Sequence, residues 1–230
     1  MREITFDTET TGLDPKSGHK IVEIGCVELI NHLPTGNVFH KYINPERDMP
    51  VEAFRVHGLS EEFLSDKPLF ADIADEFLTF VGDAQLVIHN AAFDMGFINA
   101  ELAAIGRDVI PMDRAIDTVR MARRIFPGAQ ASLNALCMRF GIDLSARDLH
   151  GALLDAQLLA AVYLELRGGR QHDMGLAAEL AAQAKNVEVT ETAPGETGRR
   201  APRTHAASPE ELARHEEFIQ KLNEPIWLRA

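Results

Sequence analysis

The sequence is short of positive charge. Its 230 residues include 23 Lys and Arg against 35 Asp and Glu, a formal net charge of −12. Proteins that bind nucleic acid by covering its phosphates with cationic side chains are normally basic. The composition therefore excludes broad phosphate neutralisation. A chain of this kind could act on nucleic acid only by gripping a short piece locally, by using metal ions as its positive charge, or by being delivered by a partner.

Long apolar runs and cysteines are also scarce. No run reaches the roughly 18 apolar residues of a membrane span, so no membrane partner is expected. The opening residues MREITFD lack the basic region, apolar stretch and cleavage site of a signal peptide. Cys26 and Cys137 are the only cysteines, and their apolar surroundings predict buried, reduced thiols. We therefore expect a cytoplasmic protein, and its hydrophobic content of 46% suffices for a full core.

The first part of the chain predicts three strands with short links, which is typical of an antiparallel meander. Helical and strand-like stretches then alternate, and this order predicts an α/β fold with a mixed five-stranded sheet flanked by helices. The predicted strands cover residues 4–10, 20–29, 37–43, 84–89 and 109–116. The predicted helices cover residues 68–81, 93–105, 118–126, 132–140 and 152–167, with a short capped turn after residue 60.

The composition changes after Gly169. Residues 185–208 contain few large apolar side chains and many Pro, Gly, Thr and charged residues, which predicts a flexible linker. Ser208 and Pro209 then begin a predicted helix. A short apolar segment cannot make its own core, so we expect it to fold onto something else. The predicted organisation is a domain over residues 1–170, a linker over 171–208 and a docking segment over 209–230.

Asp7 and Glu9 stand in the strand-like stretch FDTETTG. Side chains two residues apart on a strand share a face and lie about 6.6 Å apart along it. Two such carboxylates repel each other unless a cation lies between them. Oxygen ligands of this kind suit Mg²⁺, so the pattern favours a metal site at a strand end. A solvated edge strand with scattered acids is the alternative.

Three further polar residues stand at predicted element ends. Asp94 falls in the first turn of a helix that follows the buried strand LVIH, among core-like neighbours. Asp155 shares a helix face with inward-facing leucines, where a carboxylate without a partner is unfavourable. His150 lies about 140° from Asp155 on a regular helix, so we place it on the preceding loop. It is either a core histidine or, beside a metal-bound water, a general base.

Together these acids and the histidine predict one two-metal site. Two cations about 3.5–4 Å apart can activate a water molecule and stabilise the leaving oxygen in phosphodiester cleavage. Cations between the acids would also let an acidic protein hold a phosphate.

The motifs DTETTG, HNAAFD and LHGALLDAQ occur in this order and resemble those of the DEDDh exonuclease superfamily, whose fold is RNase H-like. All five positions of the family pattern are present. The stretches GHKIVEIG, AFRVHG and SLNALC make the chain more similar to the proofreading exonucleases of bacterial replicative polymerases, over residues 1 to about 170. The resemblance implies 3′→5′ hydrolysis of single-stranded DNA ends that releases 5′-mononucleotides.

The resemblance also implies roles for the five residues and two divalent cations, Mg²⁺ or Mn²⁺, as cofactors. Asp7, Glu9 and Asp155 would hold one cation, and Asp7 would hold the second with substrate oxygens and waters. Asp94 would act mainly through water. His150 would take the proton from the attacking water.

Two more positions are implied to bind the terminal nucleotide. Glu52 and His57, in PVEAFRVHG, match family residues near the substrate. Without the resemblance, each would be interpreted as a surface loop residue.

The tail resembles family segments that bind partners. RQHDMGL is similar to a sliding-clamp motif, with Gln171, Met174 and Leu176 as anchors, but it lacks the usual aromatic end and predicts a weak contact. The same residues could simply begin a linker. The final segment with Trp227 is similar to a polymerase-binding segment, and tethering would raise the concentration of the nuclease at the primer end.

Two other functions remain open from the sequence. One is a stand-alone DEDDh exonuclease that acts on RNA or on repair DNA ends, which would have no need of an apolar segment beyond a linker. The other is a non-catalytic scaffold of polymerase assembly, against which the complete set of five residues argues.

Overall fold

The computed structural model describes residues 1–145, 149–169 and 208–221. The chain divides into two compact units, residues 1–178 and 179–230. In the described part of the chain, no helix combines the length and apolar character required to cross a membrane.

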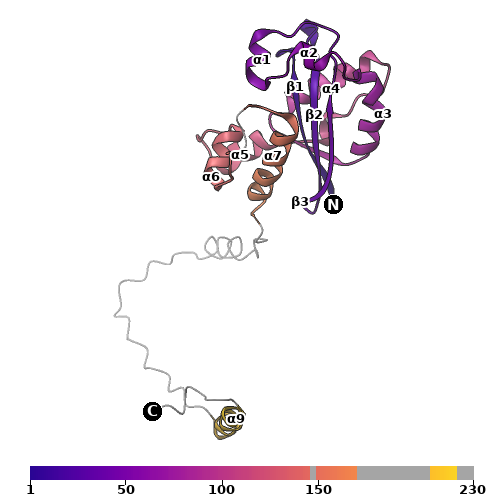
Figure 1. Ribbon diagram of the computed structural model, residues 1–230. Helices are drawn as coiled ribbons and strands as arrows, with labels where there is room; N and C mark the ends of the chain where they lie inside the picture. Colours follow the sequence, from indigo (N-terminus) through magenta and orange to yellow (C-terminus); the bar gives the residue numbers. More distant parts are fainter. Residues whose placement is uncertain (146–148, 170–207, 222–230) are drawn as a thin grey trace, which may run out of the picture. The chain divides into compact units, whose positions relative to one another are not determined.

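The first unit is built on a five-stranded sheet in the order β3-β2-β1-β4-β5 (Figure 1). The pairs β1–β2 and β2–β3 are antiparallel, whereas β1–β4 and β4–β5 are parallel. The predicted mixed sheet, three antiparallel strands followed by parallel ones, is therefore confirmed. The strands are β1 (Arg2–Thr10), β2 (Ile21–Ile30), β3 (Leu33–Tyr42), β4 (Gln85–Ile88) and β5 (Ala115–Asp117).

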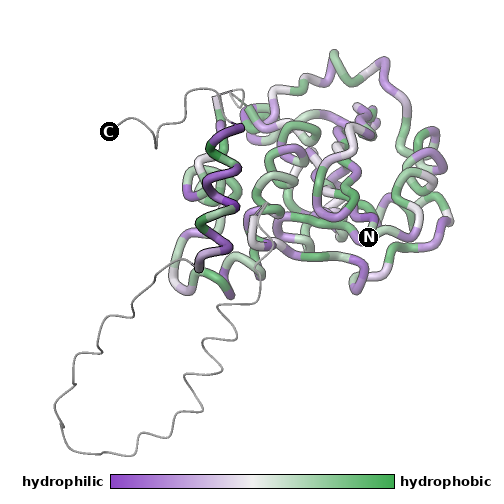
Figure 2. The backbone as a smooth tube through the Cα atoms, turned by 90° about the horizontal axis from the view of Figure 1, so that it is seen from below, coloured by the Kyte–Doolittle hydropathy of each residue, from purple (hydrophilic) through white to green (hydrophobic). Residues whose placement is uncertain are grey.

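Helices cover both faces of the sheet, and the five predicted long helices of this unit are all present. One core lies under α3 (Phe70–Val81) and α4 (Ala91–Ala104). The other lies under α5 (Thr118–Ile125), α6 (Leu133–Phe140) and α7 (Ala152–Leu166). Figure 1 shows α3 and the α5–α7 group on opposite sides of the strands. In Figure 2, hydrophobic and hydrophilic stretches alternate along the backbone, as expected of elements with one face on a core.

The alternation of side chains in β1 sends its residues to both cores. Ile4 and Phe6 point into the first core, where the Phe6 ring packs 5.7 Å from the ring of Phe77 on α3. Glu3 points to the opposite face, because its carboxylate accepts a hydrogen bond from the hydroxyl of Tyr163 on α7. By the same alternation Asp7 and Glu9 share the face toward α7, and Thr8 faces α4.

Two strand predictions are wrong at their boundaries. A strand was predicted over residues 37–43, but β3 already begins at Leu33. Only Asn31 and His32 form the turn, with φ of 51° and 68°, which suits a two-residue hairpin. Pro34 is accommodated because β3 is an edge strand.

The strand predicted over residues 109–116 is largely a loop, and β5 begins only at Ala115. Here the side chain of Asn99 makes the backbone hydrogen bonds that a neighbouring strand would otherwise make. Its amide donates to the carbonyl of Ile110 at 2.9 Å and accepts from the Ile110 N–H at 2.8 Å. A short 3₁₀ turn, η2 (Met112–Arg114), follows.

Two short helices lie together at one end of the sheet, away from the N-terminus (Figure 1). The first, α1 (Val51–His57), was not predicted, and the second is α2 (Glu61–Leu64). The expected cap of α2 is present, because the Ser60 hydroxyl accepts from the Phe63 N–H at 3.1 Å. Another 3₁₀ turn, η1 (Pro15–Ser17), follows β1.

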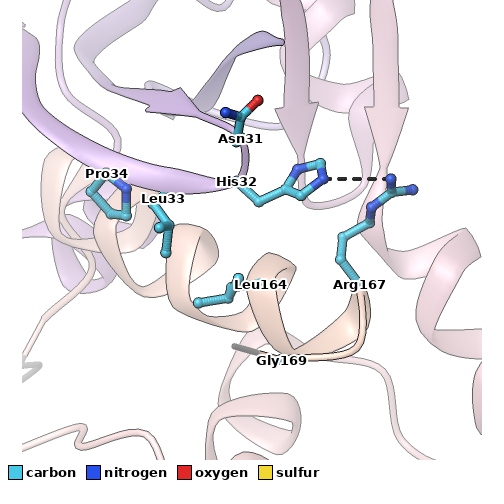
Figure 3. A pocket seen from close by; sticks show the side chains of 7 residues that line it. All are labelled: Asn31, His32, Leu33, Pro34, Leu164, Arg167 and Gly169. Atoms are coloured by element: carbon cyan, nitrogen blue, oxygen red, sulfur yellow. Dashed lines mark hydrogen bonds between the residues drawn. The ribbon is translucent and has the colours of Figure 1, made fainter. Parts of the chain in front are cut away.

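A polar chain of side chains closes the opposite end of the sheet. His32 lies 2.7 Å from the buried Glu3 carboxylate, and its other ring nitrogen lies 3.5 Å from Arg167. Figure 3 shows His32 extending from the β2–β3 turn toward Arg167 at the end of α7. His32 and Arg167 line a pocket of about 650 Å³ that contains none of the predicted site residues.

The second unit contains α9 (Pro209–Gln220). Its predicted start is confirmed, because Ser208 and Glu211 form a reciprocal capping box. The predicted linker and the predicted anchors lie outside the described residues. The anchors are Gln171, Met174, Leu176 and Trp227.

Candidate active site

The start of α7 packs close to β1 because the neighbouring strand β2 has a glycine, Gly25, at this point. Asp7 on β1 pairs directly with Gly25 on β2. The backbone of Ala152 and Leu153 passes so close to Gly25 that a Cβ there would overlap it. This close approach places Asp155, in the first turn of α7 and with a side chain only 4% exposed, beside the acids of β1.

Asp94 reaches the same place from the other face of the sheet. It lies in the first turn of α4 and is 3% exposed. The backbone N–H and the hydroxyl of Thr8 both donate to its Oδ1, at 3.0 and 2.8 Å. Thr8 lies between Asp7 and Glu9 in the sequence, and its two hydrogen bonds therefore hold Asp94 next to these acids.

Burial and neighbouring charges raise the pKa values of two of these acids. The surrounding protein raises the pKa of the half-buried Asp7 carboxyl well above its ordinary value, and the charges of Asp94, Glu9 and Asp155 raise it further. Burial likewise raises the pKa of Asp94 to about 7, although the hydrogen bonds from Thr8 oppose the shift. Such a cluster is unfavourable as four anions alone and favourable around a cation.

His150 completes the cluster from the loop before α7, as predicted. Its Nδ1 lies 3.3 Å from Asp155 Oδ2, and its side chain is 49% exposed. One donor atom each from Glu9, His150 and Asp155 lie within 4.8 Å of one another. The structure thus brings together all five predicted residues from β1, α4, the loop and α7.

The donor set fits hard divalent cations. Carboxylate oxygens are the ligands that Mg²⁺ and Mn²⁺ favour, and this set offers several of them at one point. The raised pKa values of Asp7 and Asp94 are the independent sign that positive charge is needed there.

A pocket of about 570 Å³ adjoins Glu9. Residues of α1, including Glu52 and His57, also line it, so these two residues share a pocket with one of the acids. Neither residue lies in a loop, although Glu52 is on the surface as that interpretation expected. Glu52 is exposed on α1, and His57, at the end of α1, is only 5% exposed.

Sequence reasoning missed a further buried carboxylate next to the site. Glu23 on β2 pairs with Glu9 in the ladder and lies 2.7 Å from His40 Nε2. Its charge contributes to the raised pKa of Asp7. The signal was available, since an acid in the middle of the β-forming stretch KIVEIGCVEL is expected to have a specific partner.

Comparison with known proteins agrees with this geometry. The model of the exonuclease family matches residues 4–163. The chain belongs to this family. The exonuclease is 50% identical over 228 residues to the DNA polymerase III subunit epsilon of Rickettsia felis, and the match covers 96% of this chain and 97% of the relative.

Solved structures support the same fold. Exonuclease X, in complex with 5′-overhanging duplex DNA, is 27% identical with a TM-score of 0.57, and the match covers 72% of this chain and 90% of that one. The nuclease domain of 3′hExo, a DEDDh family member bound to rAMP, is 19% identical with a TM-score of 0.63, and the match covers 74% of this chain and 94% of that one. The predicted family, fold class and 3′→5′ exonuclease class are confirmed.

Proposed function

We propose that this exonuclease is the proofreading subunit of a bacterial DNA polymerase III, which removes mispaired 3′-terminal nucleotides in the cytoplasm. The observation that carries the proposal is the convergence of Asp7, Glu9, Asp94 and Asp155 with His150 at one point. The similarity to epsilon subunits over nearly the whole chain supports the cellular role.

The carboxylates act as ligands in this proposal. Asp7, Glu9 and Asp155 would hold two divalent cations, Mg²⁺ or Mn²⁺, and Asp94 would contribute through water. When bound, the cations supply an activated water and stabilise charge on the leaving oxygen. The protein holds the acids in place through Thr8 and through the close approach of α7 to Gly25.

His150 acts as the general base. Its ring combines contact with Asp155 and substantial exposure, which suits a group that takes a proton from water and then passes it to solvent. The buried Asp155 carboxylate orients the His150 ring, as an acid orients the catalytic imidazole in other hydrolases.

The terminal nucleotide occupies the pocket lined by Glu9, Glu52 and His57. The Leu59 N–H donates to His57 Nδ1 at 3.0 Å, so the neutral ring carries its proton on Nε2. Burial lowers the pKa of His57, which favours this neutral form. The ring can then donate one hydrogen bond without adding charge.

The tail would connect the nuclease to the replication machinery. We propose that the segment 209–230, with Trp227, binds the DNA polymerase III alpha subunit. Leu212 and Phe218 on α9 are 57% and 56% exposed, and these apolar side chains support a docking role. Gln171, Met174 and Leu176 would make a weak contact with the sliding clamp.

The test is a 5′-labelled primer with a 3′-terminal mismatch, incubated with Mg²⁺ or Mn²⁺ in the presence and absence of the alpha subunit. The proposal predicts stepwise release of 5′-mononucleotides from the mispaired end, faster when the alpha subunit is present. A matched single-stranded RNA serves as the competing substrate. Faster hydrolysis of the RNA, with no effect of the alpha subunit, would favour a stand-alone enzyme and overturn the proposal.

A variant with Asp7→Asn and Glu9→Gln is the control for contaminating nucleases. It retains the shape of both side chains and removes their charge. Deletion of residues 209–230 is the control for docking, and it should abolish the stimulation by the alpha subunit while the basal hydrolysis of a short oligonucleotide persists.

A further inference from the structure

The end of α1 is in direct contact with the segment that carries His150. The backbone N–H of His150 donates to the carbonyl of Val56 at 3.1 Å. The neighbouring Leu149 side chain lies over Gly58, because a Cβ placed on Gly58 would stand only 2.7 Å from Leu149 Cδ1. Two adjacent residues are thus fixed by the last residues of one short helix and its cap.

Gly58 meets two requirements at once. Its φ of +72° is left-handed, and its N–H donates to the Phe54 carbonyl at 2.7 Å, which ends α1. Its missing Cβ leaves the space that Leu149 fills. The first requirement could be met by Asn, which tolerates the left-handed region, but its Cβ would displace the end of the Leu149 side chain.

The helix end is itself firmly held. His57 is 5% exposed, and its Nδ1 accepts the Leu59 N–H, which ties the residues before and after Gly58 together. By contrast, Leu149 is 52% exposed and the His150 side chain is 49% exposed. An exposed segment that carries a reactive side chain therefore rests on a helix end that is anchored by the buried His57.

We infer that Gly58 and Leu149 are positioning residues that set the ring of His150 against Asp155. This rests on the proposed function, in which His150 is the general base. Ala53, Val56 and His57 of the same helix also line the nucleotide pocket. Helix α1 thus forms a wall for the terminal nucleotide and a support for the base that acts on it.

The decisive variant is Gly58→Asn, which keeps the left-handed cap and fills the space under Leu149. The matched control is Gly106→Asn, because Gly106 has a φ of +70° and nothing within 4 Å of its Cβ position. Displacing the general base should lower kcat on the order of tenfold, with KM changed by less than about twofold. Gly106→Asn should leave both constants at the values of the wild-type protein.

Amide hydrogen exchange gives a readout that requires neither metal nor substrate. The His150 amide should exchange on the order of tenfold faster in Gly58→Asn than in the wild-type protein, since its hydrogen bond to Val56 is lost more often. The melting temperature of the variant, compared with that of Gly106→Asn, shows whether the fold is intact.

A double-mutant cycle isolates the contact. Leu149→Ala removes the side chain that the introduced amide would displace, so Gly58→Asn should change kcat by less than about twofold in that background. Equal effects of Gly58→Asn with and without the Leu149 side chain, or an unchanged His150 exchange rate, would overturn the inference. If the wild-type protein itself released no nucleotides, the proposed function would fail, while the exchange measurement would still report on the contact.

Discussion

Asp7 and Gly25 face each other across the β1–β2 ladder, and the backbone of Ala152 fills the place where a Cβ on Gly25 would stand. The distance between Asp7 and Asp155 thus depends on the absence of one methyl group. Helix α7 can approach the acids of β1 only because β2 presents no side chain at this point.

Gly25→Ala should therefore disable the site without altering any of its ligands. The new methyl group would push the start of α7 away from β1, and a displacement of this kind lowers kcat on the order of 10²-fold. The measurement is kcat with a single-stranded oligonucleotide. Gly96→Ala on α4, where nothing lies within 4 Å, is the control. Wild-type kcat in Gly25→Ala would show that the close approach is unimportant.

Thr8→Val should shift the pH dependence of the reaction. The Thr8 hydroxyl donates to Asp94 and holds the pKa of that carboxyl down, so its removal raises the pKa above about 7 and favours the protonated form. Activity should fall most at about pH 6.5 and recover by about pH 9. Thr5→Val, which changes a buried threonine of the same strand, should leave the profile unchanged. A loss that is uniform across pH would contradict this role.

Asp94→Asn should stabilise the metal-free protein at high pH. The folded pKa of Asp94, about 7, exceeds the unfolded value of 3.8, so this group favours folding below pH 3.8 and loses that effect as pH rises through 7. A neutral amide avoids the loss. Chemical denaturation should give a free energy of unfolding higher than wild type on the order of 2 kcal/mol at about pH 8 and nearly equal at about pH 4. A variant less stable than wild type in the alkaline measurement would refute the claim that burying the charged Asp94 carboxylate is unfavourable.

His150→Ala distinguishes between two roles of this histidine, general base and metal ligand. Loss of a general base lowers kcat by about 10²–10⁴-fold, whereas Mn²⁺ affinity should stay within about threefold of wild type. The competing possibility is concrete, because a ring nitrogen of His150 lies within 4.8 Å of donor atoms of Glu9 and Asp155. A large fall in Mn²⁺ affinity would make His150 a ligand.

The five site residues, and a sheet of three antiparallel strands followed by parallel ones, could be predicted because each depends on a local pattern. Alternation along β1 placed Asp7 and Glu9 on one face, and Gly151 separated His150 from the helix of Asp155. The placement of these groups in one site was inferred from the chemistry of acids that need a cation. The contacts that hold them, from Thr8 and Gly25, come from distant segments and have no local signature.

The errors have equally local causes. Val109 and Ile110 look like strand residues, but the Asn99 side chain takes the hydrogen bonds that a neighbouring strand would have supplied. Helix α1 was missed because it has no apolar stripe. Its apolar residues Val51, Phe54 and Val56 are all exposed, and only His57 is buried. A short helix with this pattern is stabilised by its surroundings and not by its own sequence.

The account depends most on the claim that Asp7, Glu9 and Asp155 together hold divalent cations. Electron paramagnetic resonance of Mn²⁺, titrated at mildly alkaline pH with a 5′-mononucleotide present, measures this directly. Asp7→Asn should lose Mn²⁺ binding at both positions, because in the proposed arrangement Asp7 would be a ligand of both cations. Asp83→Asn, which changes an exposed acid, should bind as wild type does. Unchanged Mn²⁺ stoichiometry and affinity in Asp7→Asn would contradict the account.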